Sequence, residues 1–153
     1  NSMFDRELNK TFNYTSSDSQ TMEWFGQNKK AEPIWATNQR GGGGRRSAAE
    51  WIGSGLIFNN QSILNIPYNH STPYNNLIDR FVEFYTDKNE PINFGALYFD
   101  EPDHTGHMYG PYSEEMSQKL DELDKTLGYM LDKLVENDLF DRLNLIITSD
   151  HGM

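Results

Sequence analysis

The run Leu143-Asn144-Leu145-Ile146-Ile147-Thr148, followed directly by Ser149-Asp150-His151-Gly152-Met153, decides the class of fold. Its first six residues have the apolar, β-branched composition of a buried strand. The residues after it place a carboxylate and an imidazole where that strand would emerge into a loop, and Gly152 allows the bend. Active sites of open α/β proteins are built at such carboxyl ends of strands.

A second apolar stretch repeats this arrangement earlier in the chain. Residues 92–99 have the density of apolar side chains expected of a strand covered on both faces, and Asp103 and His107 follow it. Between the two strands, Ser113 precedes apolar side chains at three- and four-residue steps over residues 116–134, which predicts a long capped helix. A strand–helix–strand order predicts a right-handed crossover between adjacent parallel strands. We therefore expect an α/β fold with a mostly parallel sheet, helices on both faces and both Asp–His pairs at one sheet edge.

Other segments give weaker signals. Residues 71–85 begin with Ser-Thr-Pro and continue with apolar side chains at helical spacing, which predicts an amphipathic helix with a polar cap. Residues 33–37 have the composition of a short buried strand. Residues 1–30 are interpreted as loop with one short helix at 22–27, and residues 47–68 as a loop-rich region.

Composition limits the possible functions. At 153 residues the chain is long enough for one domain with a core. The net charge of -10 argues against binding of nucleic-acid polymers, which depends on clustered Lys and Arg. A small phosphate-containing substrate remains compatible, because bound metal cations supply positive charge locally. No stretch approaches the roughly 20 apolar residues that cross a bilayer, and the absence of cysteine leaves the redox compartment open.

Four N-glycosylation sequons point outside the cell. They begin at Asn9, Asn13, Asn60 and Asn69, all in polar segments. One sequon arises readily by chance, whereas four in a chain of this length favour the secretory pathway. We expect an extracellular or cell-surface protein, with room for a membrane anchor outside this segment.

The two Asp–His pairs have the chemistry of metal ligands. Aspartate and neutral histidine together suit zinc, and carboxylates keep magnesium or manganese open. The Thr-Gly linker between Asp103 and His107 predicts a tight loop that turns both toward one ion. Asp150 and His151 can share an ion only where the strand ends, since adjacent strand residues point to opposite faces. Each pair alone has a simpler interpretation, a loop start or a hydrogen-bonded Asp–His contact, and their equivalent positions favour a shared site.

Five segments, in order along the chain, carry a resemblance to a known family. They are Asn1-Ser2-Met3-Phe4-Asp5, Pro33-Ile34-Trp35-Ala36-Thr37-Asn38-Gln39, Leu97-Tyr98-Phe99-Asp100-Glu101-Pro102-Asp103, Gly106-His107-Met108-Tyr109-Gly110-Pro111 and Asn144-Leu145-Ile146-Ile147-Thr148-Ser149-Asp150-His151-Gly152-Met153. Together they resemble the ectonucleotide pyrophosphatase/phosphodiesterase family of the alkaline phosphatase superfamily, and most closely its small, membrane-anchored members.

The resemblance implies a two-zinc phosphodiesterase. Asp103 and His107 match two ligands of one zinc ion, and Asp150 and His151 match two ligands of the other. Two metal ions can stabilise both the attacking and the leaving oxygen of a displacement at phosphorus.

The same resemblance assigns residues to the substrate. Asn1 matches an asparagine that contacts a phosphate oxygen, and Tyr98 matches an aromatic residue that contacts the nucleoside end. Without the resemblance, Tyr98 is most simply a core aromatic residue. Glu50 departs from the family, whose members often have an apolar or aromatic residue there, so the charge of the substrate pocket is open.

The family's threonine nucleophile lies upstream of the position of Asn1 and is therefore not in this chain. One aspartate and one histidine ligand also fall outside it. We expect residues 1–153 to be the central part of a single phosphodiesterase catalytic domain, truncated at both ends, that is inactive alone.

These observations favour a hydrolase that cleaves phosphodiester or pyrophosphate bonds of extracellular nucleotides, with two zinc ions in the complete domain. Two alternatives stay open: a phosphodiesterase acting on phospholipids or choline esters, and a cell-surface binding protein that kept the fold and lost catalysis. A phosphomonoesterase or phosphomutase on the same fold is a third, although Asn1 favours a diester.

Overall fold

The computed structural model describes residues 2–13, 16, 19, 24, 32–51 and 63–153. Asn1, the Asn60 sequon and all but one residue of the helix expected at 22–27 lie outside these residues. The chain divides into two compact units, which are described separately. The first comprises residues 1–69 and 88–98, and the second comprises residues 70–87 and 99–153.

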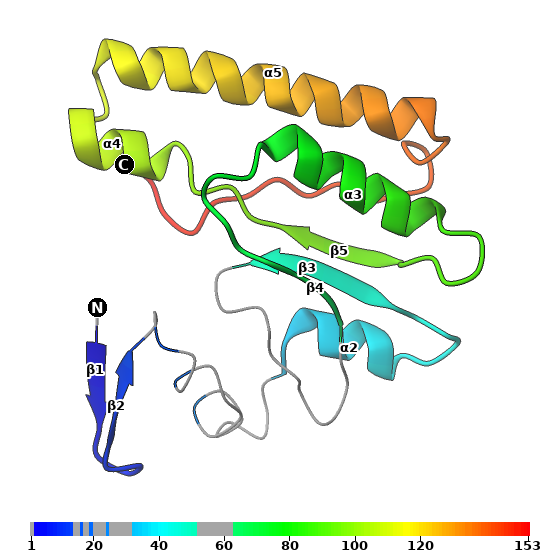
Figure 1. Ribbon diagram of the computed structural model, residues 1–153, viewed down its shortest axis with the longest axis horizontal. Coiled ribbons are helices and arrows are strands. Elements are labelled where there is room, and N and C mark those ends of the chain that lie inside the picture. The colour runs from blue at the N-terminus through cyan, green and yellow to red at the C-terminus, as the bar shows by residue number, and fades with distance from the viewer. Residues whose placement is uncertain (1, 14–15, 17–18, 20–23, 25–31, 52–62) are drawn as a thin grey trace. The chain divides into compact units, whose positions relative to one another are not determined.

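The first unit contains a three-stranded parallel sheet (Figure 1). Its strands are β3 (Ser47–Trp51), β4 (Leu64–Pro67) and β5 (Phe94–Leu97), in the order β4-β3-β5. The strand expected within residues 92–99 is confirmed as β5, and the α/β class with a parallel sheet is confirmed.

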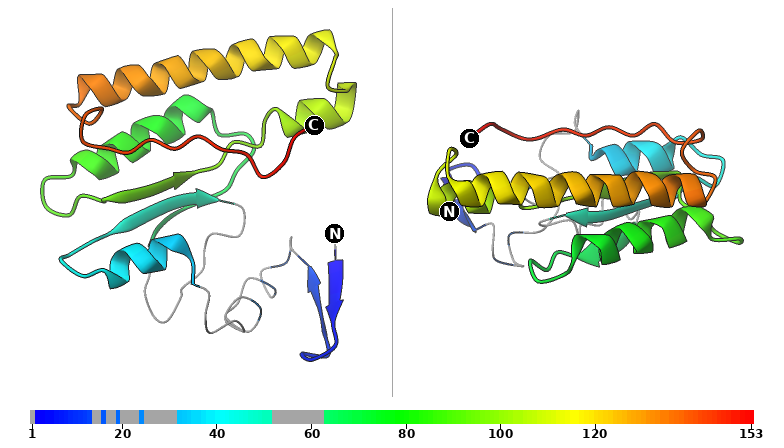
Figure 2. Two further views of the ribbon diagram at one scale, coloured as in Figure 1. Left: turned by 180° about the vertical axis from the view of Figure 1, so that it is seen from behind. Right: turned by 90° about the horizontal axis from the view of Figure 1, so that it is seen from above.

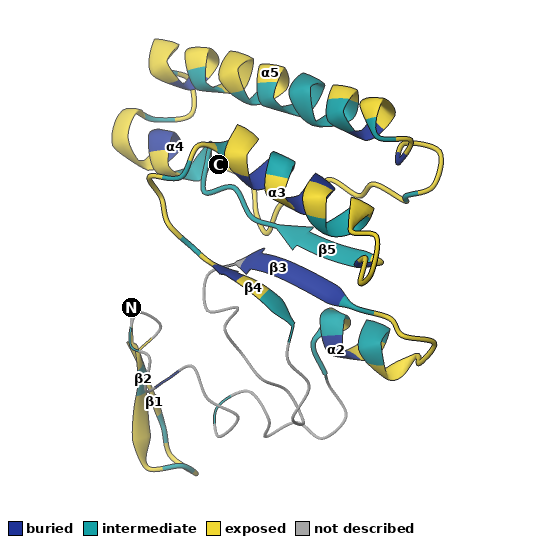
Figure 3. Cartoon of the chain, turned by 45° about the vertical axis from the view of Figure 1, so that its right-hand side comes forward, coloured by how far each residue is buried: buried dark blue, intermediate teal, exposed yellow. Residues whose placement is uncertain are grey.

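Strand β3 is the central strand and the most buried part of the sheet (Figure 3). Ala48 and Ala49 are 0% exposed, and Glu50 is only 1% exposed. The interpretation of residues 47–68 as loop was wrong for β3 and β4. Alanine and glutamate in β3 and proline in β4 have low strand propensity. Pairing of β3 with β4 on one side and with β5 on the other determines the strand conformation here.

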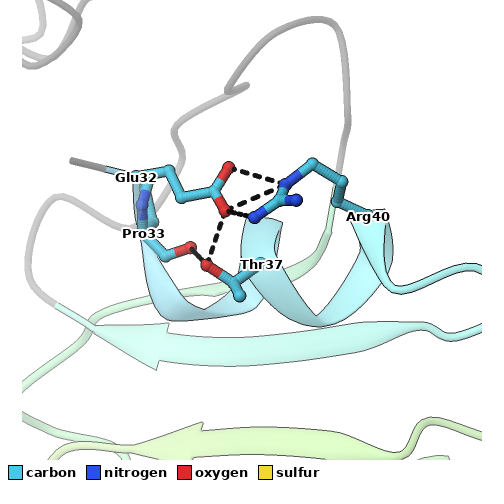
Figure 4. A network of polar contacts seen from close by, with 4 residues as sticks. All are labelled: Glu32, Pro33, Thr37 and Arg40. Carbon is cyan, nitrogen blue, oxygen red and sulfur yellow. Dashed lines mark hydrogen bonds and ion pairs between the residues drawn. The ribbon is translucent and has the colours of Figure 1, made fainter. Parts of the chain in front are cut away.

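The strand predicted at residues 33–37 was wrong, because residues 34–37 belong to helix α2 (Ile34–Arg40) and Pro33 is its N-cap. A short apolar run cannot by itself distinguish a strand from a helix. Glu32, just before the helix, accepts hydrogen bonds from Thr37 Oγ1 at 2.8 Å and Arg40 Nε at 3.0 Å (Figure 4). The hydrogen bond from Arg40 lowers the pKa of Glu32 below its usual value, so the ionised carboxylate closes the first turns of α2.

The beginning of the chain forms a hairpin where loop was expected. Strands β1 (Ser2–Asp5) and β2 (Lys10–Asn13) pair antiparallel. The Asp5 carboxylate accepts the N–H groups of Glu7 and Leu8, both at 2.9 Å, which fixes the turn between the strands.

The second unit is built from helices α3 (Tyr74–Thr86), α4 (Asp103–Tyr109) and α5 (Glu114–Glu136). Helix α3 packs along α5, and Val82, Leu134 and Leu139 form a buried cluster. Both long helices were predicted. Ser113 caps α5 as expected, since its Oγ accepts the Met116 N–H at 3.1 Å. Helix α3 has Pro73 at its N-cap and no side-chain cap, so the polar cap predicted there was wrong.

The strand predicted at residues 143–148 is absent from the described part of the chain, and that prediction was wrong. After α5 the chain runs back toward α4 without pairing to a strand (Figures 1 and 2). Ile146 is 82% exposed and Ile147 66% exposed. Composition favours an extended conformation, but a strand also requires neighbouring N–H and C=O groups to complete its ladder. The expected crossover between adjacent strands is therefore not formed within the described residues.

Candidate metal centre

Asp103 and His107 lie on one helix, α4, rather than in the tight loop that their spacing suggested. Residues four apart share a helix face, and His107 Nε2 lies 3.4 Å from Asp103 Oδ1. The Glu101 carboxylate accepts the Thr105 N–H at 3.0 Å, which ties the first turn of α4 to the preceding segment. Gly110, with φ of 92°, ends the helix.

The Asp150–His151 pair meets this face of α4. His151 Nε2 lies 3.6 Å from Asp103 Oδ1 and 3.9 Å from Asp150 Oδ1. His151 Nδ1 contacts the Gly152 carbonyl oxygen at 3.1 Å. A carbonyl oxygen only accepts, so Nδ1 is the donor and Nε2 of the neutral ring keeps its lone pair. This is the tautomer that a metal ligand needs.

Gly106 provides the surface on which the end of the chain packs. A Cβ at Gly106 would lie 2.9 Å from both Cγ and Cε of Met153 and 3.0 Å from Cε of Met116. These distances are shorter than normal carbon–carbon contacts. The absence of a side chain at Gly106 therefore lets Met153 approach α4, and Met153 is two residues from His151. The signal in the sequence was a glycine inside a helix, where its low propensity calls for a packing reason.

The residue types around Asp103 suit a cation. Asp103 Oδ1 is buried and has no hydrogen-bond partner, although two imidazole nitrogens lie within 4 Å of it. An orphaned buried carboxylate oxygen is costly unless a cation or donor occupies its lone pairs. Among the described residues, no three His, Cys, Asp or Glu side chains already stand in an arrangement that could hold a metal ion. The side chains are thus gathered around Asp103 but not in ligating positions.

A polar cluster next to these residues was not predicted from the sequence. Tyr74 Oη donates to Asp100 Oδ1 at 2.6 Å, and His70 Nδ1 contacts Asp100 Oδ2. His70 also lies edge-on to His104, with ring centroids 5.4 Å apart. Burial and the hydrogen bond to Asp100 raise the pKa of the Tyr74 phenol well above its usual value. Tyr74 is therefore a neutral donor over the physiological range.

Tyr98, the predicted substrate contact, belongs to the first unit and directly follows β5. It is half-buried, and its ring lies edge-on to Tyr68 with centroids 5.8 Å apart. Its backbone N–H donates to Glu50 Oε2 at 3.4 Å. The departure at Glu50 thus places a buried carboxylate directly beside the backbone of Tyr98.

Three of the four predicted glycosylation sites can be located. Asn9, Asn13 and Asn69 are all exposed, as attachment of a glycan requires. Asn9 lies in the β1–β2 turn with φ of 51°. Their glycosylation stays a prediction.

Comparison with known proteins identifies the family. All of residues 1–153 match the family described as type I phosphodiesterase/nucleotide pyrophosphatase. The chain belongs to this family. The family is metal-dependent, which agrees with the donor set around Asp103.

Individual relatives match over the whole chain. Human ectonucleotide pyrophosphatase/phosphodiesterase family member 5 is 39% identical over 100% of this chain and 31% of its own length. Bis(5'-adenosyl)-triphosphatase enpp4 of Xenopus laevis is 38% identical over 100% of this chain and 33% of its own length. The chain thus spans about a third of the length of these curated relatives.

Solved structures of relatives share the fold. Murine ectonucleotide pyrophosphatase/phosphodiesterase 5 superposes with a TM-score of 0.87 at 38% identity, covering 99% of this chain and 40% of that one. An inactive form of that murine protein in complex with AMP gives a TM-score of 0.79 at 36% identity, over 92% of this chain and 36% of that one. Within the part of the chain that the structure describes, no helix has the length and apolar character to cross a membrane.

Proposed function

We propose that this chain is the central part of the catalytic domain of a metal-dependent hydrolase that cleaves phosphodiester or pyrophosphate bonds of extracellular nucleotides. The observation that carries the proposal is the meeting of Asp103 and His107 with Asp150 and His151. Residues more than 40 positions apart in the chain bring two imidazoles within 4 Å of one orphaned carboxylate oxygen, and Asp150 lies beside one of these imidazoles.

In this proposal Asp103 and His107 hold one zinc ion, and Asp150 and His151 hold the other. When bound, two zinc ions supply Lewis-acid stabilisation to the attacking and leaving oxygens of a displacement at phosphorus. The Gly152 carbonyl keeps His151 Nε2 available as a ligand. The buried position of Asp103 Oδ1 keeps water away from that oxygen and strengthens its attraction to a cation.

The substrate class rests on relatives and on aromatic chemistry. A murine relative is described in complex with AMP, and another relative is named as a bis(5'-adenosyl)-triphosphatase. We assign Tyr98 to the nucleoside end of the substrate and Asn1 to a phosphate oxygen. The sequons at Asn9, Asn13, Asn60 and Asn69, together with the ectonucleotide names of the relatives, support an extracellular or cell-surface location.

The test uses the full-length protein that carries this sequence. Zinc content is measured together with nitrophenol release from nitrophenyl thymidine monophosphate and from nitrophenyl phosphorylcholine, for wild type, His107→Ala and Asp150→Asn. We expect about two zinc ions per chain. Activity should fall by more than about a hundredfold in both variants, since loss of even an outer-shell partner costs about 10–100-fold.

A matched control is available in the same unit. Asp121→Asn changes an exposed carboxylate on α5. It should retain zinc and activity. Zinc-free, inactive wild type would support a binding protein on this fold, and preference for the choline ester would move the substrate class to lipid headgroups.

A further inference from the structure

Both oxygens of the Asp100 carboxylate are engaged, one by the first residue of α3 and the other by His70, which precedes the helix. Tyr74, the first residue of α3, donates to Oδ1 at 2.6 Å, and His70 contacts Oδ2 through Nδ1. The Asp100 side chain is only 13% exposed, so these donors replace most of its hydration. Because both of its oxygens are engaged in this way, the carboxylate holds the backbone at Asp100 in place and is not available to bind a metal ion.

Tyr74 also holds the residue before Asp100. The rings of Tyr74 and Phe99 are stacked, with centroids 4.3 Å apart and an interplanar angle of 25°. One side chain of α3 therefore fixes two consecutive residues of the segment that leads into α4, through an apolar contact at Phe99 and a hydrogen bond at Asp100.

The first turn of α4 is built directly on this segment. The Asp100 carbonyl oxygen accepts the His104 N–H at 3.3 Å, and the Glu101 carboxylate accepts the Thr105 N–H at 3.0 Å. Asp103 lies inside that turn, three residues after Asp100. A shift of Asp100 would therefore move Asp103, and metal ligation tolerates only about 0.2 Å in ligand distance.

We propose that Tyr74 and His70 are positioning residues that clamp Asp100 and thereby set the place of Asp103 at the metal centre. This inference rests on the proposed function, because it needs a metal ion at Asp103. It assigns a role at the site to two residues that are not among the four proposed metal ligands.

The chain contains a close control for the hydrogen bond itself. Tyr129 Oη donates to Asp79 Oδ1 at 2.7 Å, linking α5 to α3 in the same unit. Tyr129→Phe and Tyr74→Phe each remove one Tyr–Asp hydrogen bond and keep the ring. Only the second lies on the segment that leads to Asp103, so a purely structural role predicts the same result for both.

The experiment measures zinc dissociation constants of the full-length protein by competition with a chromophoric chelator, for wild type, Tyr74→Phe, His70→Gln and Tyr129→Phe. His70→Gln keeps the Asn69 sequon intact. We expect Tyr74→Phe and His70→Gln to weaken the binding of one of the two zinc ions about tenfold or more, as loss of outer-shell partners does. Tyr129→Phe should stay within about twofold of wild type, and added zinc should restore the activity of Tyr74→Phe.

Different outcomes would overturn the positioning role and the proposed function. Zinc binding by wild type with unchanged affinity in Tyr74→Phe and His70→Gln would overturn the positioning role alone. Equal weakening in Tyr74→Phe and Tyr129→Phe would also overturn it, because the effect would then follow from general loss of stability. Absence of zinc from wild type would overturn the proposed function, and the positioning role with it.

Discussion

Gly106→Ala tests whether the packing of Met153 on α4 places the Asp150–His151 pair. The new Cβ would lie 2.9 Å from Met153 Cγ and Cε, whereas carbon atoms in contact are about 3.5–4.0 Å apart. Met153 must therefore retreat by roughly 0.6 Å or more. His151 is two residues away, and this shift exceeds the roughly 0.2 Å tolerance of a metal ligand.

The effect on stability should be small. Overpacking costs about 1–3 kcal/mol, and alanine offsets part of this cost because it gains about 1 kcal/mol over glycine inside a helix. We expect a thermal midpoint close to wild type together with zinc affinity reduced about tenfold or more. The assay pairs differential scanning calorimetry without added zinc with chelator competition on the full-length protein.

Gly128→Ala is the matched control, since a Cβ at Gly128 on α5 would meet no atom within 4 Å. It should stabilise the protein by about 1 kcal/mol and leave zinc affinity unchanged. Wild-type zinc affinity in Gly106→Ala would refute the reasoning, because the ligand pair would then be placed independently of the contact between Met153 and α4.

Three further changes test the second unit. Ser113→Ala removes the cap of α5 and should cost about 1 kcal/mol, seen as faster amide exchange in the first turn of α5. Asp138→Gly should stabilise by about 0.5–1 kcal/mol in thermal unfolding, because Asp138 has φ of 55° just after α5, where glycine avoids the Cβ penalty; no gain would mean that the aspartate side chain compensates. The raised pKa of Tyr74 implies that its stabilising contribution is complete below the ordinary tyrosine pKa of about 10 and is lost as pH rises through the higher folded-state pKa. An ultraviolet titration of tyrosinate should accordingly show that Tyr74→Phe removes a late-titrating phenol, and loss of an early one would contradict the assignment.

The sequence predicted the elements whose patterns are strong and local. Helix α5 combines a capping serine with apolar residues at helical steps over many turns, and α3 shows the same periodicity. Strand β5 was recognisable because its apolar density matches a strand in a parallel sheet. The central strand β3 was missed, because Ser-Ala-Ala-Glu-Trp has no clear period, and its alanines and glutamate are depleted in strands. Its conformation depends on β4 and β5, and such long-range pairing cannot be read from the segment alone.

The candidate site was predicted from residue type, while its geometry depends on contacts that the pattern did not contain. Sequence reasoning expected two strands to deliver both Asp–His pairs to one sheet edge. In the structure Asp103 and His107 lie on α4, and their spacing of four residues along the helix places the two side chains next to each other. Without the expected strand, the Asp150 pair still reaches α4.

The segment that carries Asp150 and His151 is fixed at its two ends rather than along a ladder. Leu143 packs against the buried cluster of Val82, Leu134 and Leu139, and Met153 packs on Gly106. Between these contacts Ile146 is 82% exposed, so the middle of the segment contributes little to holding it. The position of His151 therefore depends most on the nearer contact. That contact is made by Met153, two residues after His151, and it is made on α4, the helix that carries Asp103 and His107. A change at Leu143 should accordingly reduce stability more than metal affinity, and a change at Gly106 should do the reverse.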